Sequence, residues 1–133
     1  MTAVFADTFY FLALLNSRDA AHRKAVDFSN SSDAPLLTTA WVLTELADGL
    51  CRSSKRNAFR QVWDDLEADP NTVVIPPSQE LFAKGAELYD ARPDKEWSLT
   101  DCISFVVMEE KGVGEALTGD HHFEQAGFVA LLK

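Results

Sequence analysis

Short apolar segments alternate with amphipathic stretches along this chain, and that alternation constrains the fold more than any other feature. Residues 3–6 are all apolar and end at Asp7, while residues 72–75 are a β-branched run that ends at two prolines. Such runs are typical of strands buried on both faces of a sheet. Further strands are predicted at residues 36–37, 115–118 and 128–132.

Apolar residues three and four positions apart predict helices between these strands. Their expected bounds are 9–15, 19–28, 40–51, 58–67, 78–88 and 98–111. Ser98 begins the last helix in a capping-box pattern, because Asp101 follows three residues later. Alternating strands and helices predict the α/β class: a three-layer α/β/α sandwich with a central, mostly parallel sheet of about five strands. We expect residues 1–133 to form a single domain.

The charge balance limits what this chain can bind. Twelve Lys and Arg residues face 21 Asp and Glu residues, so the formal net charge is −9. A molecule with this charge repels a polyanion and cannot hold nucleic acid by a broad basic face. Any chemistry on nucleic acid would therefore need a bound cation.

The cysteines and the apolar segments indicate the cellular location expected for such a chain. Cys51 and Cys102 are too few for a disulfide framework, which favours a reducing compartment and makes the cytoplasm the expected location. The apolar run at residues 9–15 follows Asp7 without a Lys or Arg, and it is far shorter than the roughly 20 residues of a membrane span. We therefore expect no signal peptide, anchor or membrane association.

Four acidic residues stand at the ends of predicted elements: Asp7, Glu45, Asp101 and Asp120. In an open α/β sheet, ligands bind beyond the carboxyl ends of the strands, near the switch in strand order. Taken singly, Asp101 is explained as a helix cap, and Asp7 and Asp120 as turn or cap residues. Glu45 lies among apolar neighbours, where a carboxylate must find a partner. Four acids facing one edge would repel one another unless cations were bound.

Four motifs in order resemble those of the PIN-domain family, especially its VapC-type toxins. They are Ala6-Asp7-Thr8, Thr44-Glu45-Leu46, Ser98-Leu99-Thr100-Asp101 and Leu117-Thr118-Gly119-Asp120-His121-His122-Phe123. The resemblance covers essentially the whole chain and implies a PIN-like metal-dependent endoribonuclease. It implies an acidic quartet of Asp7, Glu45, Asp101 and Asp120, with Thr8 and Thr118 beside it. It also implies an RNA substrate, a homodimer and a protein antitoxin.

The residue types agree with hydrolysis of a phosphodiester bond. One or two divalent ions can supply a deprotonated water, neutralise the phosphate oxygens and stabilise the leaving oxygen. Hard oxygen donors favour Mg²⁺ or Mn²⁺ over Zn²⁺. We expect Asp7 and Asp101 to bind the metal directly or through water, Glu45 to complete the site or orient its water, and Asp120 to lie in or just beyond it. Zinc is not expected, since His121, His122 and the two cysteines lack zinc-site spacing.

Two further patterns can each be read in two ways. Arg52, Lys55, Arg56 and Arg60 are four of the twelve basic residues within nine positions, and on one helix three of them would align in a stripe that meets RNA phosphates. A solvated helix end accounts for the same residues. Residues 9–15 have more apolar surface than one core-facing stripe requires. That surface fits either contact with another chain or a deeply buried helix.

Two other functions compete with the ribonuclease. A PIN-like module that binds RNA or a protein without cleaving would have the same fold, but the presence of all four acids favours the enzyme. A phosphotransfer domain is disfavoured by the motifs. The paired acids of a receiver domain are absent, and Phe9 occupies the second acidic position of a D-x-D motif.

Overall fold

Five short strands form one sheet in the order β3-β2-β1-β4-β5, and every neighbouring pair is parallel. The computed structural model describes residues 2–133. The strands are β1 (Val4–Ala6), β2 (Leu36–Thr39), β3 (Thr72–Ile75), β4 (Glu115–Leu117) and β5 (Val129–Ala130). The predicted parallel sheet is confirmed. The last strand is shorter than predicted, because this edge strand pairs with β4 only through Val129 and Ala130.

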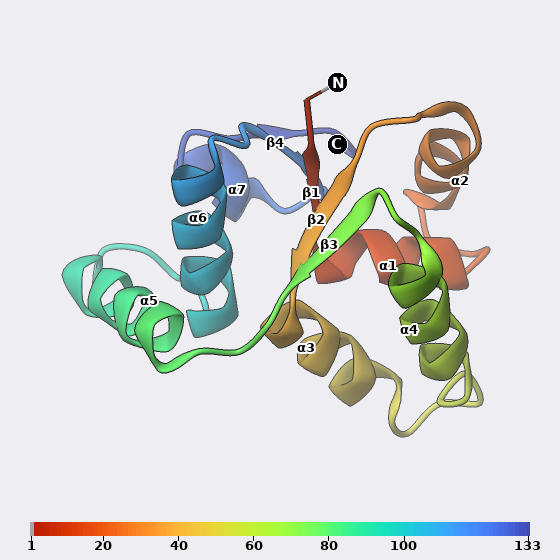
Figure 1. The fold of residues 1–133 in the computed structure, drawn as a ribbon, viewed down its shortest axis with the longest axis horizontal. Helices are drawn as coiled ribbons and strands as arrows, with labels where there is room; N and C mark the ends of the chain where they lie inside the picture. The colour runs from red at the N-terminus through yellow and green to blue at the C-terminus, as the bar shows by residue number, and fades with distance from the viewer. Residues whose placement is uncertain (1) are drawn as a thin grey trace.

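Helices cover both faces of the sheet, which confirms the predicted three layers. Figure 1 shows α1 (Thr8–Leu15), α2 (His22–Ser31) and α4 (Ala58–Ala68) on one side. On the other side lie α5 (Gln79–Ala91), α6 (Leu99–Lys111) and α7 (His121–Gln125). The remaining helix, α3 (Ala40–Leu50), directly follows β2 and contacts both α1 and α6. Across residues 2–133, the helices are all too short or too polar to cross a membrane.

Three helices differ from the sequence prediction. Helix α2 begins at His22 rather than near Asp19, because Asp19 instead holds a turn by accepting a hydrogen bond from the backbone N–H of Ala21 (2.8 Å). Helix α5 continues to Ala91, one turn beyond the predicted end. Helix α7 was not predicted, since five residues are too few to show a helical period.

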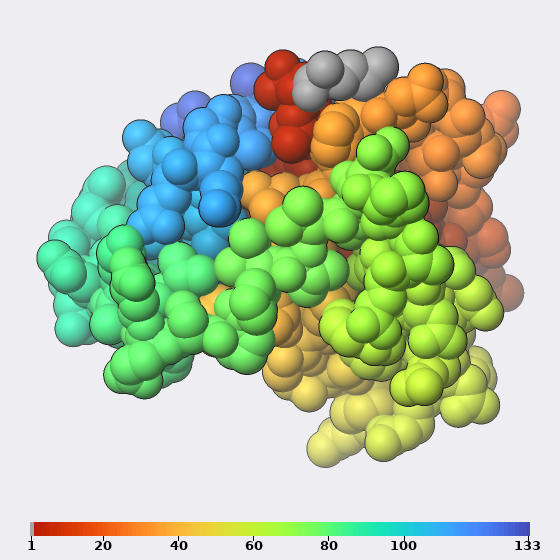
Figure 2. Space-filling view, in the orientation of Figure 1, coloured from red at the N-terminus to blue at the C-terminus, as the bar shows by residue number. Residues whose placement is uncertain are grey.

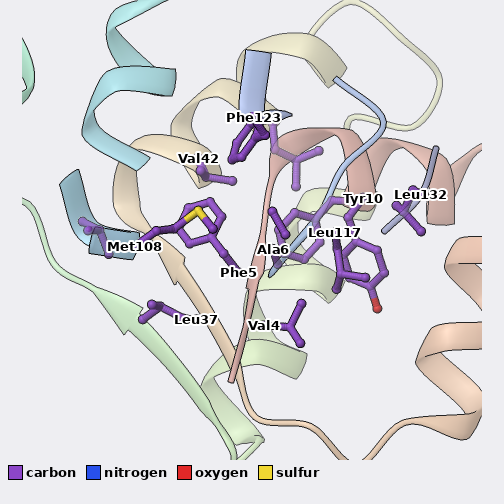
Figure 3. Close-up of a cluster of buried hydrophobic side chains, with 14 of the residues drawn as sticks. Val4, Phe5, Ala6, Tyr10, Leu37, Val42, Met108, Leu117, Phe123 and Leu132 are labelled. Atoms are coloured by element: carbon purple, nitrogen blue, oxygen red, sulfur yellow. The ribbon is translucent and has the colours of Figure 1, made fainter. Parts of the chain in front are cut away.

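The core lies between the sheet and the helices, and its centre is an aromatic contact. The fully buried rings of Phe5 on β1 and Phe123 on α7 have centroids 6.3 Å apart, and Figure 3 shows both within the cluster. All three residues of β1 are buried, as expected for a central strand covered on both faces. The parallel pairing of Phe5 with Ala116 and of Ala6 with Leu117 fixes the carboxyl ends of β1 and β4 relative to each other.

The strand order reverses between β1 and β4. From β1 the chain adds β2 and β3 on one side, and it then crosses to add β4 and β5 on the other. Asp7 directly follows β1, and Thr118 directly follows β4. Both residues therefore lie at the switch point, where sheets of this kind bind ligands.

Candidate active site

A cleft of about 460 Å³ opens at the switch point, and its walls carry all four acidic residues predicted from the sequence. Asp7, Glu45, Asp101 and Asp120 come from four different parts of the chain: the ends of β1 and β4, and helices α3 and α6. The fold therefore brings the whole quartet together. Four carboxylates around one opening form a strongly acidic surface that attracts cations.

Asp7 is buried in the cleft wall and does not act as a helix cap. Its backbone occupies the N-cap position of α1, yet its side chain makes no capping hydrogen bond, so the cap interpretation is wrong. Its Oδ2 instead accepts a hydrogen bond from the Thr118 hydroxyl at 2.8 Å. Burial raises the pKa of Asp7 to about 7; the Thr118 hydrogen bond opposes this rise, and the nearby carboxylates of Asp101 and Glu45 add to it. The site holds a carboxylate that needs a cation in order to ionise fully at neutral pH.

Glu45 is half-buried on α3 and has a hydroxyl partner. The side chain of Thr39 caps α3 by accepting a hydrogen bond from the Val42 N–H (3.1 Å), which sets where the helix begins. One turn later, the Thr8 hydroxyl donates to Glu45 Oε1 at 2.5 Å. The expectation that this carboxylate finds a partner is confirmed. Thr8 and Thr118 both lie beside the quartet, and each holds one carboxylate.

Asp101 has two structural tasks. The predicted capping box is present, since Asp101 N–H donates to Ser98 Oγ (3.0 Å) and Ser98 N–H donates to Asp101 Oδ2 (3.2 Å). The side chain nevertheless faces the cleft, where Oδ2 also lies 3.1 Å from Nδ1 of His122. Burial raises the pKa of Asp101, and the Asp120 carboxylate adds to this effect. The cap interpretation is correct, and it does not exclude a place in the cleft.

Asp120 is the N-cap residue of α7, and hydrogen bonds through Thr118 link it to Asp7 at the end of β1. Its Oδ1 accepts a hydrogen bond from the His122 N–H (2.9 Å), so the cap interpretation holds for this residue. Its own N–H donates to Thr118 Oγ1 (3.1 Å), and that hydroxyl donates to Asp7. The fully buried Thr118 therefore links Asp120 to Asp7.

Two titratable residues that line the cleft were not predicted as part of the acidic site. His122, with 17% of its side chain exposed, contacts Asp101 and lies 3.5 Å from Asp120 Oδ1. Glu96 lies in the same wall, two residues before the cap residue Ser98. Its position just before a helix that carries a site residue was the only sequence signal for Glu96. In the sequence, His122 is marked only by its position two residues after Asp120. The spacing rules for zinc sites do not consider that position.

The basic residues do not form the predicted helical stripe. Helix α3 ends at Leu50 and α4 begins at Ala58, so Arg52, Lys55 and Arg56 lie in turns. Arg60 lies on α4 and pairs with Asp64 at 3.5 Å. The connecting loop, residues 51–57, projects from the lower edge of the molecule in Figure 2, in yellow. Ser53 holds a turn in this loop, because its hydroxyl donates to the Leu50 carbonyl (3.0 Å) and accepts a hydrogen bond from the Lys55 N–H (3.0 Å).

Basic side chains without an acidic partner are nevertheless concentrated in and near this loop. Among residues 2–133, six basic side chains make no ion pair, and four of them follow α1 or lie in the loop: Arg18, Arg52, Lys55 and Arg56. Lys55 Nζ donates to the carbonyl of Leu15, which ties the loop to the end of α1. The start of the same helix lines the cleft through Phe9 and Leu12.

Helix α1 itself is covered along its length. Its apolar residues are buried or half-buried, and the large apolar side chains that are exposed lie on other elements: Val73, Phe82, Tyr89 and Val129. The burial of these residues fits the interpretation of residues 9–15 as a buried helix, and contact of this surface with another chain stays a prediction. The exposed apolar surface lies on α5 and on the two edge strands, β3 and β5.

The parallel sheet, its switch point and the acid-lined cleft define a class of α/β/α protein built to hold cations at one sheet edge. The model of the PIN domain family matches residues 4–129, and the chain belongs to that family. The chain is 30% identical over 128 residues to the 23S rRNA-specific endonuclease VapC20 of Mycobacterium tuberculosis, which covers 95% of each chain.

Solved structures agree with this assignment. The crystal structure of M. tuberculosis VapC20, described as a toxin that cleaves the sarcin-ricin loop, matches with a TM-score of 0.85 and 28% identity over 95% of this chain and 96% of that one. FitAcB from Neisseria gonorrhoeae matches with a TM-score of 0.68 and 17% identity, over 96% of this chain and 94% of that one. The second similarity shows the fold alone.

Proposed function

We propose that this chain is a divalent-metal-dependent endoribonuclease of the VapC type, the toxin of a toxin–antitoxin pair. The observation that carries the proposal is the quartet of carboxylates around one cleft at the switch point. Its support is the similarity to VapC20, an rRNA endonuclease, over 95% of both chains. We propose ribosomal RNA as the substrate class on the same ground.

The donor set of the cleft fits Mg²⁺ or Mn²⁺. Asp7, Glu45, Asp101 and Asp120 offer hard oxygen atoms, and the burial of Asp7 without a cationic partner leaves a carboxylate that a metal would satisfy. When bound, a divalent ion supplies an activated water and neutralises charge on the phosphate. The chain itself orients the carboxylates: the Thr118 hydroxyl holds Asp7, the Thr8 hydroxyl holds Glu45 and the capping box holds Asp101.

The test is incubation of the purified protein with 23S rRNA and with an unrelated structured RNA, in Mg²⁺, in Mn²⁺ and in chelator. We expect cleavage of the rRNA with metal and none with chelator, because a group of carboxylates alone repels a phosphate. Equal cleavage in chelator would contradict the metal-dependent reaction. Tight RNA binding without cleavage in either metal would instead support the non-cleaving module.

We propose that the cations at residues 52–56, with Arg18, hold the RNA backbone beside the cleft. Arg56→Ala is expected to weaken RNA binding and to lower the slope of log K against log salt by about one ion. Arg23→Ala is the matched control, because Arg23 is an exposed arginine that already pairs with Asp27. Both are compared by fluorescence anisotropy with labelled RNA in chelator. A slope that stays unchanged in Arg56→Ala would assign these residues to the solvated surface.

We also propose that the protein forms a homodimer, binds a protein antitoxin and works in the cytoplasm. Phe82 and Tyr89 give α5 exposed apolar area for a protein contact, with 44% and 51% exposure. Both cysteines are free, as expected in a reducing compartment.

A further inference from the structure

A group of possible metal ligands lies at the α7 side of the cleft. Asp120, His121 and His122 each offer one ligand atom, and these atoms all lie within 4.8 Å of one another. Nδ1 of His122 is 3.5 Å and Nδ1 of His121 is 3.6 Å from Asp120 Oδ1. Two ligands of a tetrahedral Zn²⁺, each about 2.0–2.1 Å from the ion, are about 3.3 Å apart. The observed separations are close to those of donors that share one ion.

A carboxylate from a distant part of the chain contacts this group. Asp101 Oδ2, on α6, lies 3.1 Å from Nδ1 of His122. The group is reachable from solvent, since 64% of the His121 side chain and 32% of the Asp120 side chain are exposed. The sequence spacing argued against zinc because the two histidines are adjacent. The structure places a carboxylate donor beside them, Asp120, the cap residue of α7.

We propose that Asp120, His121 and His122 form a mixed nitrogen and oxygen site that binds Zn²⁺ and related transition-metal ions. Imidazole nitrogen favours such ions over Mg²⁺, which prefers oxygen ligands and keeps its water. The site differs in its donors from the carboxylate quartet of the cleft, although it shares Asp120 with that quartet.

Zinc at this site blocks RNA cleavage, and this part of the inference rests on the proposed function. Zinc binding takes Asp120 away from the carboxylate quartet of the cleft, so that the quartet no longer holds a magnesium ion with its full set of donors. A simpler account of the same contacts is a hydrogen bond from His122 to Asp101 and a solvated His121, and it expects no zinc binding of defined stoichiometry.

The first experiment measures binding without RNA. Zn²⁺ is titrated calorimetrically into the purified protein in excess Mg²⁺, and Co²⁺ is used as a spectroscopic probe of the ligand geometry. We expect one Zn²⁺ per chain, and a loss of affinity of at least about tenfold in His121→Ala and in His122→Gln. His22→Gln is the matched control, since His22 lies on α2 and contacts the Ala13 carbonyl. Absence of binding, or equal affinity in His121→Ala, would overturn the site.

The second experiment measures cleavage in Mg²⁺ with and without Zn²⁺. We expect zinc to inhibit the wild-type protein and His121→Ala to resist that inhibition, while His121→Ala cleaves normally in Mg²⁺ alone. Zinc that binds through His121 but leaves cleavage unchanged would refute the blocking role. If the protein cleaves no RNA while zinc binding still depends on His121, the site stands and the proposed function fails.

Discussion

Replacing Asp7 with asparagine is expected to lower RNA cleavage by at least about 10²–10³-fold, the order of loss seen when one electrostatic stabiliser is removed from an active site. Asparagine keeps the shape and can still accept the hydrogen bond from Thr118, but it offers no charge to a divalent ion. Initial rates on 23S rRNA in Mg²⁺ provide the measurement. The effect should exceed that of any substitution outside the quartet.

The matched control is Asp27→Asn, which removes an exposed carboxylate that pairs with Arg23 on α2. This variant is expected to cleave at the wild-type rate, because its carboxylate lies outside the cleft. Wild-type rates in Asp7→Asn would exclude Asp7 from the reaction. They would also leave the buried carboxylate without a functional role.

The same substitution is expected to stabilise the metal-free protein at alkaline pH. Because burial raises the pKa of Asp7 to about 7 from an ordinary 3.8, the folded protein binds a proton over a range in which the unfolded chain has released it. The free energy of unfolding therefore falls as the pH rises from about 4 to about 7. At about 1.4 kcal/mol per pKa unit, the full loss is at most about 4 kcal/mol. Asp7→Asn does not titrate and avoids this loss.

Urea unfolding in chelator at about pH 4 and pH 8 measures this effect. We expect the two proteins to be similar at the lower pH and Asp7→Asn to be about 1–3 kcal/mol more stable at the higher pH. Addition of Mn²⁺ at pH 8 should stabilise the wild type much more than the variant, because only the wild type keeps the full ligand set. If Asp7 mainly makes local hydrogen bonds, the variant will instead be the less stable protein at pH 8.

The sheet could be predicted from the sequence because its strands are buried on both faces. A β-branched run such as residues 72–75, closed by two prolines, fits a short buried strand far better than a helix, and the alternation with helices fixes the class of fold. Helix α7 could not be predicted in this way, because its five residues form around a single cap, Asp120. The start of α2 was misplaced for a similar reason, since Asp19 favours a turn over one more helical turn.

The acidic quartet could be predicted because Asp7, Asp101 and Asp120 follow a strand or start a helix, where chain order determines position, and because Glu45 lies among apolar residues of a helix. His122 could not be assigned to the cleft, since its contact with Asp101 joins residues 21 positions apart and depends on how α7 packs against α6. The arginine stripe failed because a helical period was extended through Ser53, where the chain forms turns. Spacing predicts a shared face only within one unbroken element.

Because Asp101 both caps α6 and lines the cleft, a substitution at this position affects the folding of the protein as well as the cleft. A chain in which residue 101 becomes alanine loses the acidic group of the cleft and also half of the capping box that starts α6. Loss of a capping side chain costs about 1 kcal/mol, so such a chain would be less well folded as well as lacking one acid of the proposed site. Glu45 caps no helix and can mutate to glutamine at little cost to folding. Inactive descendants of this protein should therefore lose the acid at position 45 more often than the acid at position 101.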